Sequence, residues 1–277
     1  MKSKKFTVAI ILIFFVGLIV LLYPTVADYF NAKSQSRVVA QYYHDIEALN
    51  MEDFTELFEQ ARAYNEELLK KRDRFRLKDA EIEEYMGMLN PFNNGVMGTL
   101  IINAIDVRLP IYHGTGEGVL QIGAGHFEGT SLPIGGIGTH SVITGHRGLP
   151  SSTLLTRLDR MAIGDTFMLN VLNDVLTYKI DQIIVVLPDE MDELSIVADK
   201  DYCTLITCTP YGVNSHRMLV RGERTANALE NIGAEAGLID GILVAALMIA
   251  PVFIIVAVIF GIRVKKIYKR SKNTYDR

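Results

Sequence analysis

Two long runs without a charged residue, Phe6–Leu22 and Gly241–Ile262, constrain the fold of this 277-residue chain more than any other feature. A bilayer core of about 30 Å requires roughly 20 apolar residues in helical form. The second run reaches that length even with Pro251 near its middle, because a transmembrane helix packed against neighbours tolerates proline. We therefore expect a transmembrane helix over 241–262.

The first run is shorter and follows three lysines, so it is either a transmembrane anchor or a cleaved signal segment. The residues after it, Tyr23–Asp28, lack a clear small-x-small cleavage site, which favours an uncleaved anchor over 6–23. Lysine and arginine near membrane ends mark the cytoplasmic side. Because both tails are basic, we expect residues 1–5 and 263–277 inside the cell and the segment between the two runs outside it.

The charge of the intervening segment excludes one class of partner. The tails hold 10 of the 28 basic residues and one of the 32 acidic residues, which leaves 18 basic and 31 acidic, a net charge of about −13. An acidic domain repels phosphate backbones, so nucleic acid is not an expected partner. A basic protein substrate is compatible with this charge. The two apolar runs make the lipid bilayer an expected partner.

The external segment changes character near residue 93. Over 24–92, apolar residues recur at intervals of three and four, which predicts a helix with one apolar stripe: Phe54, Leu57, Phe58, Ala61, Tyr64 and Leu68. Over 93–225, short β-like runs alternate with Gly, Pro and Asn, which is typical of a sandwich or a closed barrel. The predicted strands are Thr99–Ile105, Ser141–Thr144, Thr166–Val171, Leu176–Val186, Thr204–Thr209 and Met218–Arg221, with a hairpin turn at 172–175. Residues 226–240 are a short linker.

The chain has two cysteines, Cys203 and Cys208, within one apolar run that is expected to form a buried strand. Their separation of five residues sends the two side chains to opposite faces of a strand. A disulfide between them is therefore not expected, and a free thiol outside the cell requires a reason.

A catalytic cysteine needs a nearby base or cation, because the thiolate is the nucleophile. Five of the six histidines lie in the β-rich region: His113, His126, His140, His146 and His216. Taken singly, each histidine is more often structural, and a cysteine in an apolar strand is usually a small buried hydrophobe. Neither HExxH nor paired CxxC spacing occurs, so no metal site or cofactor is expected.

Two segments read together favour catalysis. Residues 204–217 read TLITCTPYGVNSHR and residues 139–150 read THSVITGHRGLP. These segments resemble the sortase family, in which a TLxTC strand end is followed by an arginine on the next strand and preceded by a histidine far upstream. The match, over about 46–225, is to class C sortases, the pilin polymerases of Gram-positive bacteria, which also carry a second membrane helix.

The resemblance implies a mainly β fold. A helical layer and lid over 24–92 would be followed in the sequence by an eight-stranded sortase-type barrel over 93–225. It implies Cys208 as the nucleophile, His146 as the general acid/base and Arg217 as the cation that holds the substrate or stabilises the oxyanion. His140 is the rival for the histidine role and Arg221 the rival for the arginine role. The contexts of His146 and Arg217 fit the family better.

The implied activity is cysteine transpeptidation at the cell membrane, with a two-pass chain and an external catalytic domain. A class C sortase cuts a pilin's LPxTG-like motif after threonine, forms a thioester and transfers the acyl group to a lysine of the next pilin. The alternatives are attachment of surface proteins to peptidoglycan, or hydrolysis by a thiol peptidase. Outside the enzymes, the alternative is a non-catalytic receptor or scaffold ectodomain in which Cys208 is simply buried.

The family also tends to carry a lid before the barrel, in which an acid and an aromatic residue cover the site. The best match is Asp73–Phe75, which lacks the family's proline between them. The alternative, Asn90–Phe92, keeps proline and the aromatic residue but loses the acid. We expect Asp73 to pair with Arg217 and Phe75 to cover Cys208.

Overall fold

The computed structural model describes residues 2–71, 73–227, 260–261 and 263–264. The predicted linker (226–240), second membrane helix (241–262) and basic tail (263–277) lie almost wholly outside the described residues and stay predictions. The chain divides into two units, Met1–Leu229 and Glu230–Arg277, and the description that follows concerns the first.

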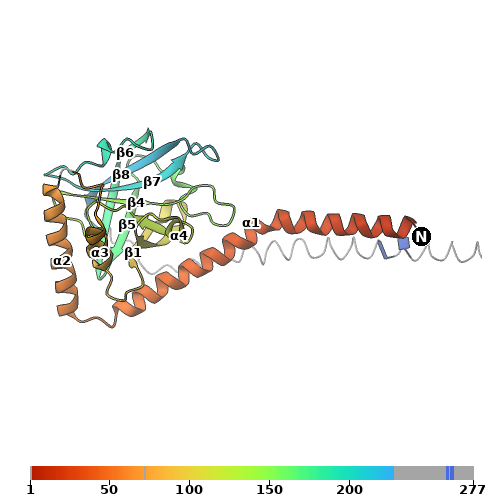
Figure 1. Cartoon of the computed structure of the whole chain (residues 1–277), viewed down its shortest axis with the longest axis horizontal. Helices are drawn as coiled ribbons and strands as arrows, with labels where there is room; N and C mark the ends of the chain where they lie inside the picture. The colour runs from red at the N-terminus through yellow and green to blue at the C-terminus, as the bar shows by residue number, and fades with distance from the viewer. Residues whose placement is uncertain (1, 72, 228–259, 262, 265–277) are drawn as a thin grey trace, which may run out of the picture. The chain divides into compact units, whose positions relative to one another are not determined.

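Eight strands close into a barrel in the order β1-β2-β3-β4-β7-β8-β6-β5. The barrel lies on the left of Figure 1. The β2–β3 and β4–β7 pairs are parallel, and the other neighbours are antiparallel. The predicted mainly β, eight-stranded barrel is thereby confirmed. The strands are β1 (Val96–Ile102), β2 (Val107–His113), β3 (Ala124–His126), β4 (Thr139–Thr144), β5 (Thr166–Val171), β6 (Asp174–Val186), β7 (Asp201–Thr209) and β8 (His216–Thr225).

Two of these strands, β2 and β3, have no counterpart in the sequence prediction. β2 contains Pro110, which usually argues against a strand because proline cannot donate to the ladder. Here β3 pairs only with residues 111–113 of β2. On the β3 side of the strand, Pro110 therefore has no paired residue that would need its missing N–H. The prediction that the first strand runs through Ile105 is wrong, because residues 103–105 form a 3₁₀ turn that ends at Asp106 in the left-handed region (φ 53°).

Helix α1 (Lys2–Ile46) runs through Pro24 without a break. Within the described part of the chain it is the one helix long and apolar enough to cross a membrane, in agreement with an N-terminal anchor or signal segment. Its C-terminal end is tied to the barrel, because Tyr42 Oη donates to the Met97 carbonyl (2.9 Å) and accepts from the Leu172 amide (2.8 Å).

The helical layer comprises α2 (Met51–Lys70) and α3 (Asp79–Gly87), which lie beside the barrel in Figure 1. Asn50 caps α2 by accepting from the amides of Glu52 and Asp53. The predicted apolar stripe is confirmed: Phe54, Phe58, Ala61 and Leu68 are buried, and Leu57 and Tyr64 pack at the edge of the core.

Candidate active site

The strands β4, β7, β8 and β6 are neighbours and share one outer face, and side chains along each strand alternate between this face and the core. On β7, Cys203 and Leu205 are fully buried in the core, whereas Cys208 is partly exposed. Both cysteines are free, as expected from their spacing. Burial raises the pKa of the Cys203 thiol well above its ordinary value, which leaves Cys208 as the accessible thiol.

Cys208 is the second-last residue of β7, and its register partner on β8 is Arg217. Directly opposed residues of antiparallel strands have Cβ atoms about 4.5–5.5 Å apart, so the two side chains are neighbours. Arg217 Nη1 donates to the carbonyl oxygens of Asn214 (3.2 Å) and His216 (3.1 Å). Within the described residues its Nε and Nη2 have no hydrogen-bond partner, so these donors remain available to a substrate oxygen.

His146 follows the end of β4, which runs parallel to β7. The Gly145 amide donates to the Ile206 carbonyl (3.1 Å), and Thr207 Oγ1 donates to the Gly145 carbonyl (2.8 Å). These bonds continue the parallel register beyond the strand end. His146 therefore lies alongside Cys208, on the side of β7 away from β8.

The side chain of His146 is 23% exposed, and its Nε2 lies 3.3 Å and 3.4 Å from the two carboxylate oxygens of Glu117. Among the side chains that the structure describes, no hydrogen bond joins His146, Cys208 and Arg217 directly. The arrangement is three adjacent groups on three neighbouring chain segments: a thiol, an imidazole and a cation. Such a set can carry out nucleophilic attack on a carbonyl with proton transfer and charge stabilisation.

The two rival residues have structural partners. His140 is fully buried, with Nδ1 donating to the Ser195 carbonyl (2.9 Å) and Nε2 accepting from Thr204 Oγ1 (2.7 Å). Desolvation lowers the pKa of His140 to about 4, which keeps it neutral. Arg221 forms a two-point pair with Asp181 (3.1 and 2.7 Å) and lies 4.3 Å above the Tyr202 ring. Neither group is free to act on a substrate.

Two further histidines of the β region are also buried. His126 contacts Tyr85 Oη through Nδ1 (2.9 Å) and donates to the Ser131 carbonyl through Nε2 (2.8 Å), and desolvation lowers its pKa to about 4. The ring of His113 lies between the carbonyls of Gly95 and Met88, and burial lowers its pKa. Both are core histidines.

The loop after α2 brings Arg74 and Phe75 onto the outer face. Phe75 packs against an apolar cluster that includes Val142, Ile206 and Leu219, and Ile206 lies two residues before Cys208. Arg74 is buried, donates to the Leu194 carbonyl (2.5 Å) and lies 4.7 Å above the Phe75 ring. Burial lowers the pKa of this guanidinium, which makes no ion pair among the described residues.

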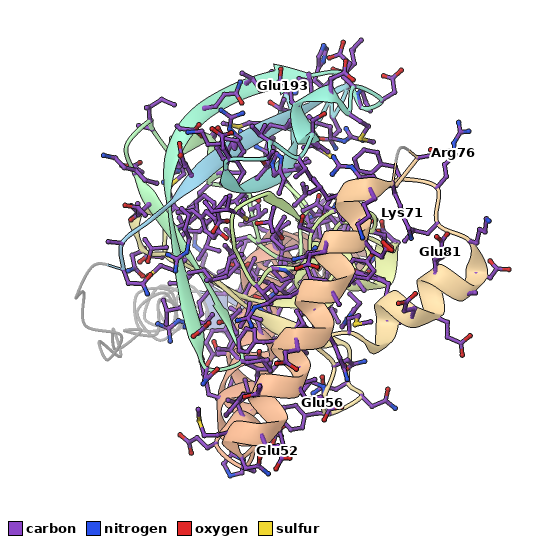
Figure 2. The ribbon with its side chains drawn as sticks, turned by 90° about the vertical axis from the view of Figure 1, so that its left-hand side faces the viewer. Glu52, Glu56, Lys71, Arg76, Glu81 and Glu193 are labelled. Atoms are coloured by element: carbon purple, nitrogen blue, oxygen red, sulfur yellow. The ribbon has the colours of Figure 1, made fainter. Side chains whose placement is uncertain are left out.

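Backbone packing fixes this loop against the barrel. A Cβ added to Gly129, whose φ is +80°, would meet the Arg74 carbonyl oxygen, so only glycine allows the close approach. At the base of the loop, Lys71 pairs with Glu81 across 2.8 Å, and Figure 2 shows these two residues near the end of α2.

Asp73 is exposed, and within the described residues the side-chain partners of Arg217 are the carbonyls of Asn214 and His216, not Asp73. The expected Asp73–Arg217 contact is therefore not formed in this structure, because the Arg217 guanidinium faces carbonyls of its own loop. The alternative lid, Asn90–Phe92, leads directly into β1, and its Phe92 packs against the main barrel core. Its position favours the loop at 73–75 as the lid, which remains a prediction.

The sequence gives no signal for two residues at this site. Glu117 begins the short helix α4 (Glu117–Leu120) between β2 and β3, the two strands that the pattern does not reveal. No spacing rule connects it to His146. Arg74 lies within the predicted lid triplet, but a charged side chain in a loop is usually solvated, and its burial depends on the Leu194 carbonyl.

The chain resembles known proteins in the region that carries this site. Residues 100–225 match the Sortase domain family. A curated relative, Sortase A of Streptococcus agalactiae serotype III (strain NEM316), is 30% identical over 120 residues, which span 42% of this chain and 48% of the relative. The match thus covers about half of that protein's length.

Solved structures match a larger share of the chain. Sortase C1 from Streptococcus agalactiae is 44% identical with a TM-score of 0.66, and the match covers 69% of this chain and 100% of that one. Sortase C from Streptococcus pneumoniae is 42% identical (TM-score 0.63; 69% and 97% covered). Clostridium perfringens sortase C, solved with the C-terminal cell wall sorting motif, is 42% identical (TM-score 0.62; 69% and 100% covered).

Proposed function

This chain belongs to the class C sortases, and from that premise we propose that it cuts an LPxTG-like motif of a pilin after threonine and transfers the acyl group to a pilin lysine. The observation that carries the proposal is the register of β7 and β8, which opposes Cys208 to Arg217, with His146 on the other flank of β7. A sortase C related in sequence was solved with a cell wall sorting motif, which supports a substrate of this chemical class.

The first half-reaction forms a thioester. The Cys208 thiolate attacks the threonine carbonyl carbon, the carbonyl π electrons move to oxygen, and Arg217 stabilises the oxyanion. When the tetrahedral intermediate collapses, the carbon–nitrogen bond breaks and protonated His146 gives its proton to the leaving amine. Arginine suits the oxyanion because it stays charged and presents a fork of donors.

The second half-reaction consumes the thioester. A lysine ε-amine attacks the acyl carbon, His146 takes the proton that the amine loses, and the carbon–sulfur bond breaks to restore the Cys208 thiolate. The products are an isopeptide bond and the enzyme with its imidazole again protonated. Each proton that His146 donates in the first half-reaction is recovered in the second.

We also propose that the reaction takes place outside the cell beside the membrane, with the chain crossing the bilayer twice. The apolar N-terminal helix supports one crossing. The basic tail after residue 262 supports the orientation of the second.

The identity of the acceptor separates this proposal from its alternatives. Full-length protein in detergent, given an LPxTG peptide, is offered a pilin with an acceptor lysine, a peptidoglycan-precursor amine or water alone. We expect lysine-linked product to dominate with the pilin. Transfer mainly to the wall-precursor amine, or hydrolysis that pilin does not suppress, would contradict the pilin-polymerising role while leaving the thioester chemistry intact.

A further inference from the structure

The side chain of His146 contacts a carboxylate that the three-residue site does not include. Its Nε2 lies 3.3 Å from Glu117 Oε2 and 3.4 Å from Oε1, so both oxygens are almost equally near the same ring nitrogen. Within the part of the chain that the structure describes, this is the one side-chain hydrogen bond of the imidazole.

The position of Glu117 is determined by neighbouring contacts. Two residues earlier, Thr115 is bound to Glu128 through both its amide (3.2 Å) and its hydroxyl (3.1 Å). One helical turn later, Gln121 Nε2 donates to Glu117 Oε1 (3.0 Å). The hydrogen bond from Gln121, and then the charge of His146, lower the pKa of the Glu117 carboxyl, so it is ionised at neutral pH.

We infer that Glu117 is a positioning residue for His146, which holds the imidazole by Nε2 so that it can exchange protons with the amines of the transpeptidation. The inference rests on the proposed function. A carboxylate at Nε2 selects the neutral tautomer that carries its proton there, which leaves Nδ1 as the free base. When both nitrogens are protonated, the same carboxylate stabilises the imidazolium that must protonate the leaving amine.

Other charged groups near His146 do not compensate for Glu117. The guanidinium of the next residue, Arg147, is turned to Asp159 (2.5 Å) and Thr209 Oγ1 (3.3 Å). The next groups across the sheet are the thiol of Cys208 on β7 and the guanidinium of Arg217 on β8, and neither is a carboxylate that could replace Glu117. The Glu117 side chain is 67% exposed, and solvent weakens such a pair. We therefore expect an effect of about two- to fivefold on rate rather than the larger loss typical of a buried triad.

The chain offers a matched control for this pair. Glu56 accepts from Gln60 Nε2 four residues later (3.1 Å), just as Glu117 accepts from Gln121, but it lies on α2 and faces no histidine. Figure 2 shows Glu56 on α2, toward the end that carries Glu52. Glu56→Gln removes the same charge from the same local geometry without touching the site.

The test measures thioester formation by full-length protein in detergent at several pH values. We expect Glu117→Gln to lower kcat about two- to fivefold with little change in KM. The limb of the pH profile that needs protonated imidazole should move toward lower pH. Glu117→Asp should restore part of the rate, and Glu56→Gln should match wild type. An unchanged rate and pH profile in Glu117→Gln would overturn the inference about Glu117. Thioester formation by wild type in the same assay would still support the proposed function.

A second measurement needs no substrate. Diethyl pyrocarbonate modifies neutral imidazole, so mass spectrometry can follow its reaction with His146 near pH 6, with His44, whose side chain is 79% exposed, as the internal reference. We expect Glu117→Gln to be modified faster than wild type at His146 and equally fast at His44. Equal rates at His146 contradict the inference even if wild type forms no thioester.

Discussion

Arg217 and Arg221 lie on the same strand, yet only Arg217 is opposed to Cys208 and lacks a carboxylate partner among the described residues. Arg221 is held by Asp181 and by the Tyr202 ring. The two arginines therefore have different consequences when changed to lysine, which keeps the charge and loses the fork of donors.

We expect Arg217→Lys to lower kcat/KM for thioester formation by about 10²–10³, the usual cost of a lost oxyanion donor. Arg221→Lys should stay within a few-fold of wild type. The measurement is single-turnover acylation followed by intact mass. A larger loss in Arg221→Lys than in Arg217→Lys would reverse the assignment of the two residues.

The buried histidines predict a loss of stability in acid. His126 and His140 have pKa values lowered to about 4 in the fold, against about 6.5 when unfolded, so the unfolded chain binds their protons first. Above pH 6.5 both histidines are neutral in either state, so the free energy of unfolding keeps its full value. As the pH falls toward 4, it decreases by on the order of 3 kcal/mol for each histidine. Asp201, whose pKa burial raises, opposes this trend.

Urea unfolding at pH 7 and pH 4.5 measures the change. His140→Gln keeps a donor and an acceptor but cannot titrate, so its stability should depend less on pH than that of wild type. His44→Gln changes an exposed histidine and should leave the dependence unaltered. A wild-type protein equally stable at both pH values would contradict the buried, neutral state of these histidines.

The loop at 73–75 should control access to Cys208. Phe75→Ala removes a ring from the apolar cluster beside Ile206, and Arg74→Ala removes the bond to the Leu194 carbonyl, so both should speed alkylation of Cys208 several-fold. Arg76→Ala, an exposed neighbour labelled in Figure 2, is the control.

The charged part of the predicted lid is tested separately. Asp73→Ala should leave alkylation of Cys208 unchanged, because the Arg217 guanidinium faces carbonyls of its own loop and not Asp73. Faster alkylation in Asp73→Ala would contradict this arrangement. Unchanged rates in Asp73→Ala, Phe75→Ala and Arg74→Ala together would rule out a lid at this loop.

Helix α1 bonds to the loop that follows His146. Asp28 accepts from both the amide (2.6 Å) and the hydroxyl (3.0 Å) of Thr153, and Asn31 donates to the Ser151 carbonyl (2.7 Å). Charge-assisted bonds of this kind contribute roughly 1.5–3 kcal/mol. We expect Asp28→Ala to increase hydrogen exchange at the Thr153 amide, whereas Ser36→Ala, whose hydroxyl bonds only within its own helix, should not. Equal exchange in both variants would show that the helix does not brace the loop.

The β-rich character of residues 93–225 could be predicted from short-range patterns, whereas the barrel and the roles of Cys208, His146 and Arg217 are what the resemblance to sortases implies. The opposite faces of Cys203 and Cys208 and the apolar stripe of α2 follow from short-range periodicity. β2 and β3 could not be predicted in this way. Pro110 interrupts one strand, and the other is three residues long and ordered by its neighbours.

The contacts that tune the site are long-range, which is why the sequence does not reveal them. Glu117 and His146 are 29 residues apart and meet only because β3 pairs with both β2 and β4. Arg74 and Leu194 are 120 residues apart. The expected Asp73–Arg217 contact depends on tertiary detail of the same kind. In the structure Asp73 is exposed, and the next residue, Arg74, is the one that is buried.

The central claim is that Cys208 forms the acyl-enzyme, and intact-mass spectrometry of full-length protein with an LPxTG peptide tests it directly. Wild type and Cys203→Ala, which removes the buried thiol, should both gain the mass of the peptide acyl group, and Cys208→Ala should gain none. Pilin should then remove the adduct and acquire it on a lysine. An adduct that persists in Cys208→Ala, or that disappears in Cys203→Ala while the protein stays folded, would contradict the account.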